Sequence, residues 1–112
     1  MQITDFYPVL LREACLSKDP HRKVCAAAFD KYLNRLASGW NGIPRKMQDL
    51  PERYNKPLKN FYVVHAEANL VASAARLGIS LQDSSVLVTE LHPCANCAGL
   101  LAQAGILSVY YP

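Results

Sequence analysis

Two short stretches decide the fold of this chain: His65-Ala66-Glu67 and, further along, Pro93-Cys94-Ala95-Asn96-Cys97. Cys94 and Cys97 lie three residues apart, and at the start of a helix this spacing separates two side chains by about 60° around the axis, so both sulfurs can reach one ion. His65 adds a nitrogen ligand. Three protein ligands leave the fourth position of tetrahedral zinc open, as in catalytic zinc sites. The sequence therefore predicts a Zn²⁺ cofactor held by His65, Cys94 and Cys97.

The carboxylate of Glu67 has a separate task beside this metal site. Two thiolates cancel the charge of Zn²⁺, so the metal acidifies its water less than a site with three neutral histidines does, and a base is needed. Glu67 is next to a ligand in sequence and can move a proton. Because residues two apart are about 200° apart on a helix, His65 and Glu67 can meet only over the helix N-terminus. A helix N-terminus should also lower the pKa of Cys94 and Cys97.

Residues 1–112 are expected to form one domain, because a chain of 112 residues has room for a single hydrophobic core. Hydrophobic residues make up 51% and charged residues 19% of the chain, a balance typical of folded globular proteins. No apolar run approaches the roughly 20 residues that cross a bilayer, so we expect a cytoplasmic protein without a membrane partner. A net charge of +3 suits an anionic small molecule, and nucleic acid is not an expected partner.

The pattern of apolar residues predicts alternating helices and strands. Helical spacing marks residues 4–16 and 65–77, and Gly78 can end the second helix because glycine tolerates a left-handed backbone. Pro93 is placed to start a third helix and Gly105 to end it. Short apolar runs predict strands over 23–29, 36–40, 85–91 and 106–111. Prolines and charges favour a long loop over residues 41–60, which we expect to border a functional site.

The order of these elements predicts an α/β fold with a mixed sheet covered by helices. The first two strands form an antiparallel hairpin, whereas the later strands, separated by a helix, run parallel with a right-handed crossover. The zinc site would then lie beyond the C-terminal ends of strands, over two helix N-termini. Cys15 and Cys25 are expected to be buried small side chains, because the compartment is taken to be reducing.

Two other interpretations of the cysteine motif stay open. A C-x-x-C that opens a helix after a strand is also typical of a thioredoxin-like redox site, although the His65-Ala66-Glu67 stretch favours a metal. A purely structural zinc site would need a fourth ligand, for which the candidates are His21, His92, Cys15 and Cys25. None of the four lies at ligand spacing, and His92 is interpreted as a surface or packing residue.

The paired H-x-E and P-C-x-x-C motifs resemble the signature of zinc-dependent nucleobase deaminases. Three further segments extend the resemblance, over nearly the whole chain, to the deoxycytidylate deaminase family: Ser17-Lys18-Asp19-Pro20, Gly39-Trp40-Asn41-Gly42-Ile43-Pro44-Arg45 and Val63-Val64-His65-Ala66-Glu67-Ala68-Asn69. The resemblance implies a three-layer α/β/α, cytidine deaminase-like fold and the conversion of dCMP to dUMP. It also implies that Glu67 is the proton shuttle, that Asn41 contacts the sugar and that the Ala66 N–H contacts the base.

A nucleotide substrate also needs a phosphate site. The basic candidates are Lys18, Arg22, Lys23, Arg45, Lys46 and Arg53. We favour Lys18 and Arg45, because they lie inside the resembling segments. Some members of that family are activated by dCTP and inhibited by dTTP, and residues 41–44 resemble their nucleotide-sensing segment, so such an effector is a further expected partner. Enzymes of this type generally form homo-oligomers, which would cover the edges of a four-stranded sheet.

Two features depart from the family's pattern. Val24-Cys25 stands where the family usually has Val-Gly, so the first strand must accept a side chain. The sequence ends at Pro112, where relatives usually continue with another helix and strand. Two rival functions therefore stay open: a deaminase of cytidine, guanine or a tRNA adenosine, and a non-catalytic, zinc-containing nucleotide-binding module.

Overall fold

A computed structural model describes residues 1–90 and 92–112. Its sheet has the order β2-β1-β3-β4. The strands are β1 (Cys25–Phe29), β2 (Arg35–Trp40), β3 (Ser85–Val88) and β4 (Ser108–Tyr110). β1 pairs antiparallel with β2 and with β3, whereas β3 and β4 are parallel. The predicted mixed sheet, with an N-terminal hairpin and later parallel strands, is confirmed. The third strand ends earlier than predicted, and the last residue of that prediction, Leu91, lies outside the described residues.

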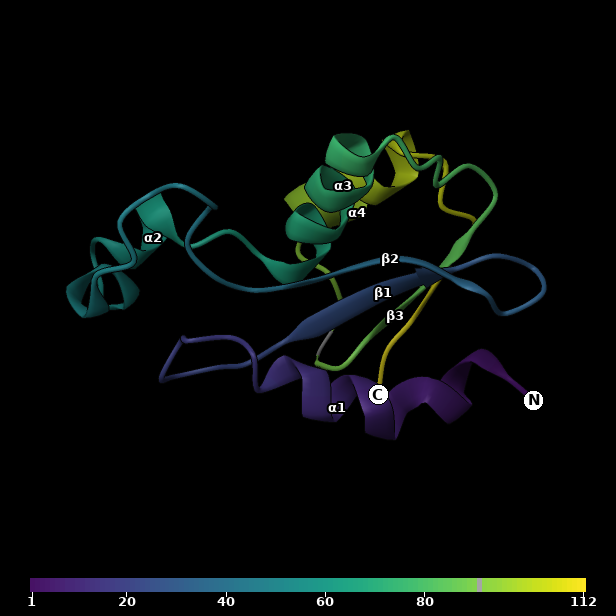
Figure 1. The fold of residues 1–112 in the computed structure, drawn as a ribbon, viewed down its shortest axis with the longest axis horizontal. Helices are drawn as coiled ribbons and strands as arrows, with labels where there is room; N and C mark the ends of the chain where they lie inside the picture. The colour runs from purple at the N-terminus through teal and green to yellow at the C-terminus, as the bar shows by residue number, and fades with distance from the viewer. Residues whose placement is uncertain (91) are drawn as a thin grey trace.

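Helices cover both faces of this sheet. The first predicted helix consists of a 3-10 turn, η1 (Ile3–Phe6), followed by α1 (Tyr7–Ala14). α1 lies on one face, and α3 (Ala66–Leu77) and α4 (Ala95–Gln103) lie on the other (Figure 1). The α/β/α arrangement is therefore confirmed. Within the described ranges, no helix has the length and apolarity that crossing a membrane requires.

The segment over residues 41–60 is less irregular than the sequence predicted. It contains a 3-10 helix, η2 (Pro51–Tyr54), and α2 (Lys59–Tyr62) begins near its end. Pro51 is tolerated at the first position of η2 because the first N–H groups of a helix have no partner within it. Figure 1 shows η2 and α2 projecting away from the sheet.

The side chains of β1 divide between two cores because successive residues of a strand point to opposite faces. Ala26 and Ala28 belong to the core under α3 and α4, and Cys25 and Phe29 belong to the core under α1. Cys25 is fully buried, and burial raises the pKa of its thiol to about 11. The strand thus accommodates the departure from Val-Gly. The prediction for Cys15 was wrong: this side chain is exposed, since it follows directly on the last turn of α1.

The motif residues lie at the N-termini of α3 and α4, partly as caps and partly in the first turns. His65 is the N-cap of α3, and Gly78, with φ of 71°, ends this helix as predicted. Cys94 is the N-cap of α4, so Pro93 precedes the helix instead of being its first residue. The first turns of both helices therefore carry the chemically active side chains.

Gly39 allows α3 to lie directly on β2. A Cβ atom at this position would clash with the main-chain nitrogen of Leu70 and lie 2.8 Å from the carbonyl oxygen of Ala66. Both atoms are backbone of the first half of α3, which cannot move without displacing the residues around His65. Only glycine therefore fits here.

We predict that Gly39→Ala lowers the free energy of unfolding by about 3 kcal/mol, because the methyl group must push α3 off the sheet. Urea-induced unfolding followed by circular dichroism measures the change. Gly99→Ala is the matched control: nothing lies within 4 Å of an added Cβ, and alanine in a helix should stabilise by about 0.5–1 kcal/mol. Equal stability of Gly39→Ala and wild type would contradict this account of the packing.

Candidate metal centre

His65, Cys94 and Cys97 meet where α3 and α4 begin. His65 Nδ1 lies 3.6 Å from Cys94 Sγ and 3.5 Å from Cys97 Sγ. The three ligand atoms all lie within 4.8 Å of one another, and Cys97 is buried. The main-chain N–H of Cys97 donates to Cys94 Sγ over 3.4 Å, which fixes the two sulfurs relative to each other. The predicted position over two helix N-termini is the one observed.

These separations match the donor set of a tetrahedral zinc site. Bonds of about 2.0–2.1 Å to nitrogen and about 2.3 Å to sulfur, at the tetrahedral angle, separate the two ligand atoms by about 3.6 Å. The nitrogen–sulfur distances in this protein are 3.5 and 3.6 Å. One nitrogen and two sulfurs also suit zinc better than a hard cation such as Mg²⁺. The residues therefore fit the metal that the sequence predicted.

The environment of Cys97 departs from the expectation that a helix N-terminus lowers its pKa. Burial raises the pKa of this thiol to about 12, and the hydrogen bond with Cys94 and the negative charges of Glu67 and Cys94 act in the same direction. Burial outweighs the helix dipole because the helix offers only partial charges, whereas a buried thiolate loses its hydration.

A cavity of about 240 Å³ opens beside the three ligands. It is lined by Arg22, Val24, Asn41, His65, Ala66, Glu67, Val88, Glu90, His92 and Cys94. Glu67 is only 6% exposed, so its carboxylate is held inside the wall of this cavity and not on the outer surface. Asn41 and Ala66, the two residues that the resemblance assigned to sugar and base, line the same cavity. Sequence reasoning thus found most of its polar groups.

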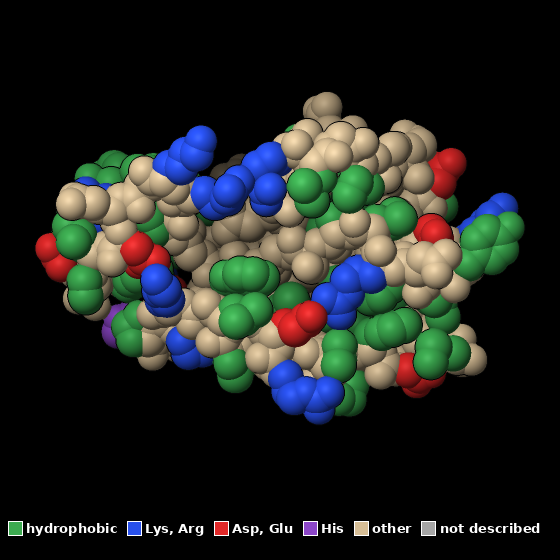
Figure 2. Space-filling view, viewed as in Figure 1, with side chains coloured by type: hydrophobic (Ala, Val, Ile, Leu, Met, Phe, Trp, Pro, Cys, Tyr) green, Lys and Arg blue, Asp and Glu red, His purple; other side chains and the backbone are tan. Residues whose placement is uncertain are grey.

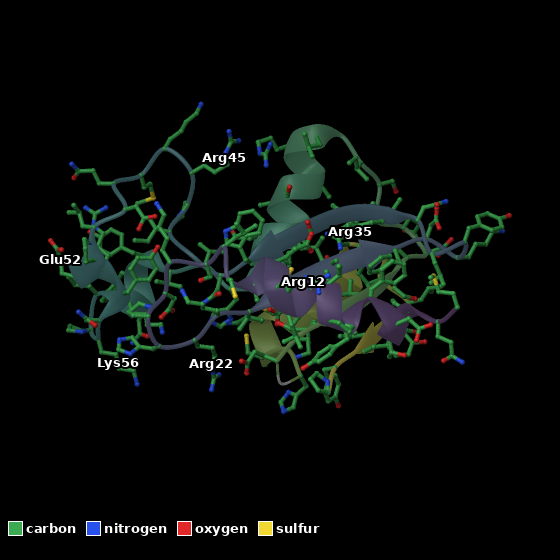
Figure 3. All side chains as sticks on the ribbon, turned by 60° about the horizontal axis from the view of Figure 1, so that its bottom comes forward. Arg12, Arg22, Arg35, Arg45, Glu52 and Lys56 are labelled. Atoms are coloured by element: carbon green, nitrogen blue, oxygen red, sulfur yellow. The ribbon has the colours of Figure 1, made fainter. Side chains whose placement is uncertain are left out.

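The two favoured phosphate residues do not line this cavity. Lys18 forms an ion pair with Asp49 at 3.4 Å, and Arg45 lines a different cavity. Among the lysines and arginines of residues 1–90 and 92–112, Arg22 alone lines the metal cavity. Figure 3 shows Arg22 and Arg45 pointing to opposite sides of the molecule. The position of a basic residue inside a resembling segment did not predict which cavity its side chain would reach.

A buried polar cluster holds the cavity wall in place. Asp19 is fully buried and forms an ion pair with Lys59 at 2.8 Å. Its other oxygen accepts hydrogen bonds from the N–H groups of His21, at 2.8 Å, and Arg22, at 3.3 Å. Asn41 donates to the Arg22 carbonyl over 2.8 Å and to Asp19 over 3.3 Å. Residues 19–22 are therefore fixed to the end of β2.

A second cavity, of about 480 Å³, lies between the segment after β2 and α3. Figure 2 shows a hollow in this region flanked by Lys and Arg side chains. Its lining includes one aromatic residue, Trp40, and three basic residues, Arg45, Lys46 and Arg76. Asn69, which also lines it, donates to the carbonyl of Trp40 over 2.8 Å. A cavity with these groups can accommodate an anionic ligand that carries a flat ring.

Comparison with known proteins agrees with this geometry. The family model described as the cytidine and deoxycytidylate deaminase zinc-binding region matches residues 2–112. A probable deoxycytidylate deaminase of Drosophila melanogaster is 37% identical over 95% of this chain, and the deoxycytidylate deaminase of Homo sapiens is 35% identical over 95%. The crystal structure of dCMP deaminase from the cyanophage S-TIM5, in complex with dCMP and dUMP, superposes with a TM-score of 0.80 at 29% identity, over 96% of this chain and 77% of that one.

The fold and the site define the class of the molecule: an α/β/α domain with a His/Cys/Cys group suited to zinc at two helix N-termini. The chain belongs to the cytidine and deoxycytidylate deaminase zinc-binding family. It spans 56% of the length of the Drosophila relative and 61% of the human one.

The buried carboxylate of Asp19 provides a test of the polar cluster. We predict that Asp19→Ala lowers the free energy of unfolding by about 3 kcal/mol, because it leaves Lys59 and the amide of Asn41 without their acceptor. The exposed acidic residue Glu52 is the control, and Glu52→Ala should change stability by less than about 0.5 kcal/mol. Urea unfolding at pH 7 measures both.

We also predict that the stability difference between the wild type and Asp19→Ala depends on pH. Burial alone would raise the pKa of Asp19, but hydrogen bonds from Lys59, His21 and Arg22, together with the charge of Lys59, lower it below its ordinary value. Since the folded pKa lies below the unfolded pKa of about 3.9, the contribution of Asp19 is complete above about pH 4 and is lost as the pH falls through the folded value. A stability difference between wild type and Asp19→Ala that grew on acidification would contradict this assignment.

Proposed function

We propose that this chain carries out the zinc-dependent hydrolytic deamination of dCMP to dUMP. The observation that supports it most directly is that the cluster of His65, Cys94 and Cys97 adjoins a cavity whose lining includes Glu67. In this proposal His65, Cys94 and Cys97 hold the zinc ion, and Glu67 is the catalytic carboxylate. A protein with three ligands and a separate carboxylate has the parts of a hydrolytic site, whereas a structural zinc site would fill the fourth position with protein.

Glu67 performs the proton transfers of this reaction. A zinc ion held by the three ligands supplies Lewis acidity that makes water more acidic. Glu67 takes a proton from the attacking water and delivers it to the ring nitrogen N3 while the oxygen bonds to C4. It then takes the second proton of that oxygen and delivers it to the amino group, so the C4–N bond breaks and ammonia leaves. Because Glu67 lines the cavity, its carboxylate could reach the ring of a cytosine bound there.

The substrate assignment rests on the relatives and on the cavity. Curated relatives of this chain carry the name deoxycytidylate deaminase, and the S-TIM5 enzyme was crystallised with dCMP and dUMP. The lining of the cavity supports contacts of Ala66 with the base and of Asn41 with the sugar. Contacts of Lys18 and Arg45 with the substrate stay predictions from the resemblance, and neither residue lines this cavity.

A nucleotide effector is a second candidate ligand, and the second cavity supports it. Arg45, Lys46 and Arg76 can pair with the negative charges of a triphosphate, and the ring of Trp40 can stack on a base. Gly42 exchanges two main-chain hydrogen bonds, of 3.0 and 2.8 Å, with Val64, which directly precedes the ligand His65. A ligand in the second cavity would therefore act on the segment that positions the metal site. The resemblance names dCTP and dTTP as the nucleotides to test.

Assembly and location stay predictions from the sequence. The exposed residues of β4 and the chain after it include Tyr110 and Tyr111, which are 42% and 52% exposed. β4 is also an edge strand of the sheet, and edge strands with apolar neighbours are commonly covered by a partner. These features are consistent with a homo-oligomer, and the cytoplasmic location stays a prediction from the sequence.

We predict that Glu67→Gln lowers turnover of dCMP by about 10²–10⁴-fold, because the amide cannot accept a proton. Its zinc content should remain that of the wild type, since Glu67 is not a ligand. Ammonia release measures turnover, and metal analysis of the purified proteins measures zinc. Cys94→Ser is the matched comparison, and it should lose both zinc and activity, whereas Cys15→Ser should lose neither.

The same assays separate the rival functions. The substrate assignment would be wrong if wild-type protein with one zinc per chain left dCMP unchanged. It would have to deaminate cytidine, guanine or adenosine in a single-stranded oligonucleotide instead. Nucleotide binding without turnover of any of these substrates would favour a non-catalytic module. Full activity of Glu67→Gln would contradict the proposed role of Glu67 in proton transfer.

For the effector, we predict that dCTP changes the rate at dCMP concentrations below KM and that dTTP opposes it. Arg45→Ala should weaken the apparent affinity for dCTP by about 10-fold, the loss expected for one charge-assisted contact. Arg12→Ala, which removes an exposed arginine from α1 on the other face of the sheet, is the control. Absence of any dCTP effect on rate and on equilibrium binding would contradict this second proposal.

A further inference from the structure

We propose that Arg22 binds the 5′-phosphate of the substrate, exchanging its ion pair with Glu90 for the phosphate, and that it thereby makes the site selective for a nucleotide over a nucleoside. The inference rests on the proposed deamination of dCMP and names the residue that recognises its charged end. Arg22 and Glu90 both line the metal cavity, and Figure 3 shows the Arg22 side chain directed away from the ribbon.

The main chain of Arg22 is held by hydrogen bonds, whereas its side chain is exposed. Its N–H donates to Asp19 over 3.3 Å, and its carbonyl accepts from Asn41 over 2.8 Å. Asn41 also accepts from the N–H of Val24 over 2.9 Å, so the residues around Arg22 are held by buried groups. The side chain of Arg22 is 59% exposed. The held backbone keeps Arg22 at the cavity, and its exposed side chain leaves the guanidinium accessible to a ligand.

The pairing of Arg22 with Glu90 is weak enough to be exchanged. Arg22 Nε lies 4.0 Å from Glu90 Oε2, and the side chain of Glu90 is 38% exposed. Solvent-exposed ion pairs at such distances contribute little to the stability of a fold. A phosphate monoester carries more negative charge than a carboxylate and matches the planar fork of a guanidinium with two parallel hydrogen bonds. A bound nucleotide can therefore displace Glu90.

The other basic side chains near the chain segment of Arg22 have different partners. Lys23 donates to the carbonyl of Ser17, and Lys59 is paired with the buried carboxylate of Asp19. Lys18 is paired with Asp49. Arg53 donates to the carbonyl of Gln48 over 2.7 Å and lies over the ring of Tyr62. Within the part of the chain that the structure describes, Arg22 is the permanent cation that faces the metal cavity.

The test compares dCMP with deoxycytidine, which lacks only the phosphate. Arg22→Ala should lower kcat/KM for dCMP by about 10–100-fold, the loss expected for a charge-assisted contact, and should leave kcat/KM for deoxycytidine within about twofold. Arg22→Lys should recover part of the loss. Glu90→Gln should lower KM for dCMP, because Arg22 then has no competing carboxylate. Arg12→Ala is the matched control and should behave as the wild type.

A binding measurement keeps the inference testable apart from turnover. Calorimetry on zinc-loaded Glu67→Gln protein, with and without Arg22→Ala, should show weaker binding of dCMP and unchanged binding of deoxycytidine. If the wild type deaminates neither compound but Arg22→Ala weakens dCMP binding, the proposed function fails and the inference about Arg22 stands. The inference is overturned if Arg22→Ala leaves unchanged the ratio of kcat/KM for dCMP to kcat/KM for deoxycytidine. It is also overturned if the variant leaves unchanged the ratio of the two binding affinities.

Discussion

The positions of His65 and Glu67 in the metal cavity depend on how closely α3 approaches β2 at Gly39. The carbonyl oxygen of Ala66 and the main chain near Leu70 occupy the space that any larger residue would need. Because His65 is the N-cap of this helix and Glu67 lies in its first turn, the contact sets the height of both above the sheet. α4, which contains Cys97 and has Cys94 as its N-cap, packs in the same apolar core as α3, through Leu101. A shift of α3 would therefore change the distances between the nitrogen and both sulfurs.

A second constraint, made of polar groups, sets the opposite wall of the cavity. Asn41 satisfies main-chain groups of Arg22 and Val24 and reaches the buried carboxylate of Asp19. Both hydrogens of its amide nitrogen are used in this way, so its side chain serves the structure of the wall as well as any contact with a ligand. Apolar packing on one side and hydrogen bonds on the other thus meet at a cavity that neither would form alone. The charge of Asp19 is tolerated there because Lys59 and two main-chain N–H groups surround it.

The parts of the site that sequence could predict are those determined by local spacing. A C-x-x-C at a helix start and an H-x-E at another specify their own geometry, so the sequence could predict that His65, Cys94 and Cys97 cluster and that Glu67 lies beside them. The helical repeat of residues 65–77 and the glycine after it likewise gave α3 almost to the residue. The direction of a cation depends instead on the path of the chain: Arg22 reaches the metal cavity while Arg45 does not. The exposure of Cys15 and the helices inside residues 41–60 also depend on tertiary contacts that no short pattern contains.

The end of β2 links the two cavities through the alternation of a strand. Trp40 and Gly42 line the second cavity, and Asn41, between them, lines the metal cavity. Successive residues of an extended chain face opposite sides, so one short segment forms part of both walls. The segment is tied to the residue before His65 by the hydrogen bonds between Gly42 and Val64, and to α3 by the bond from Asn69 to Trp40. A ligand that displaced Trp40 would therefore move Asn41 and, with it, the carbonyl of Arg22. The path between the cavities is short, because three consecutive residues of the main chain each line one cavity or the other.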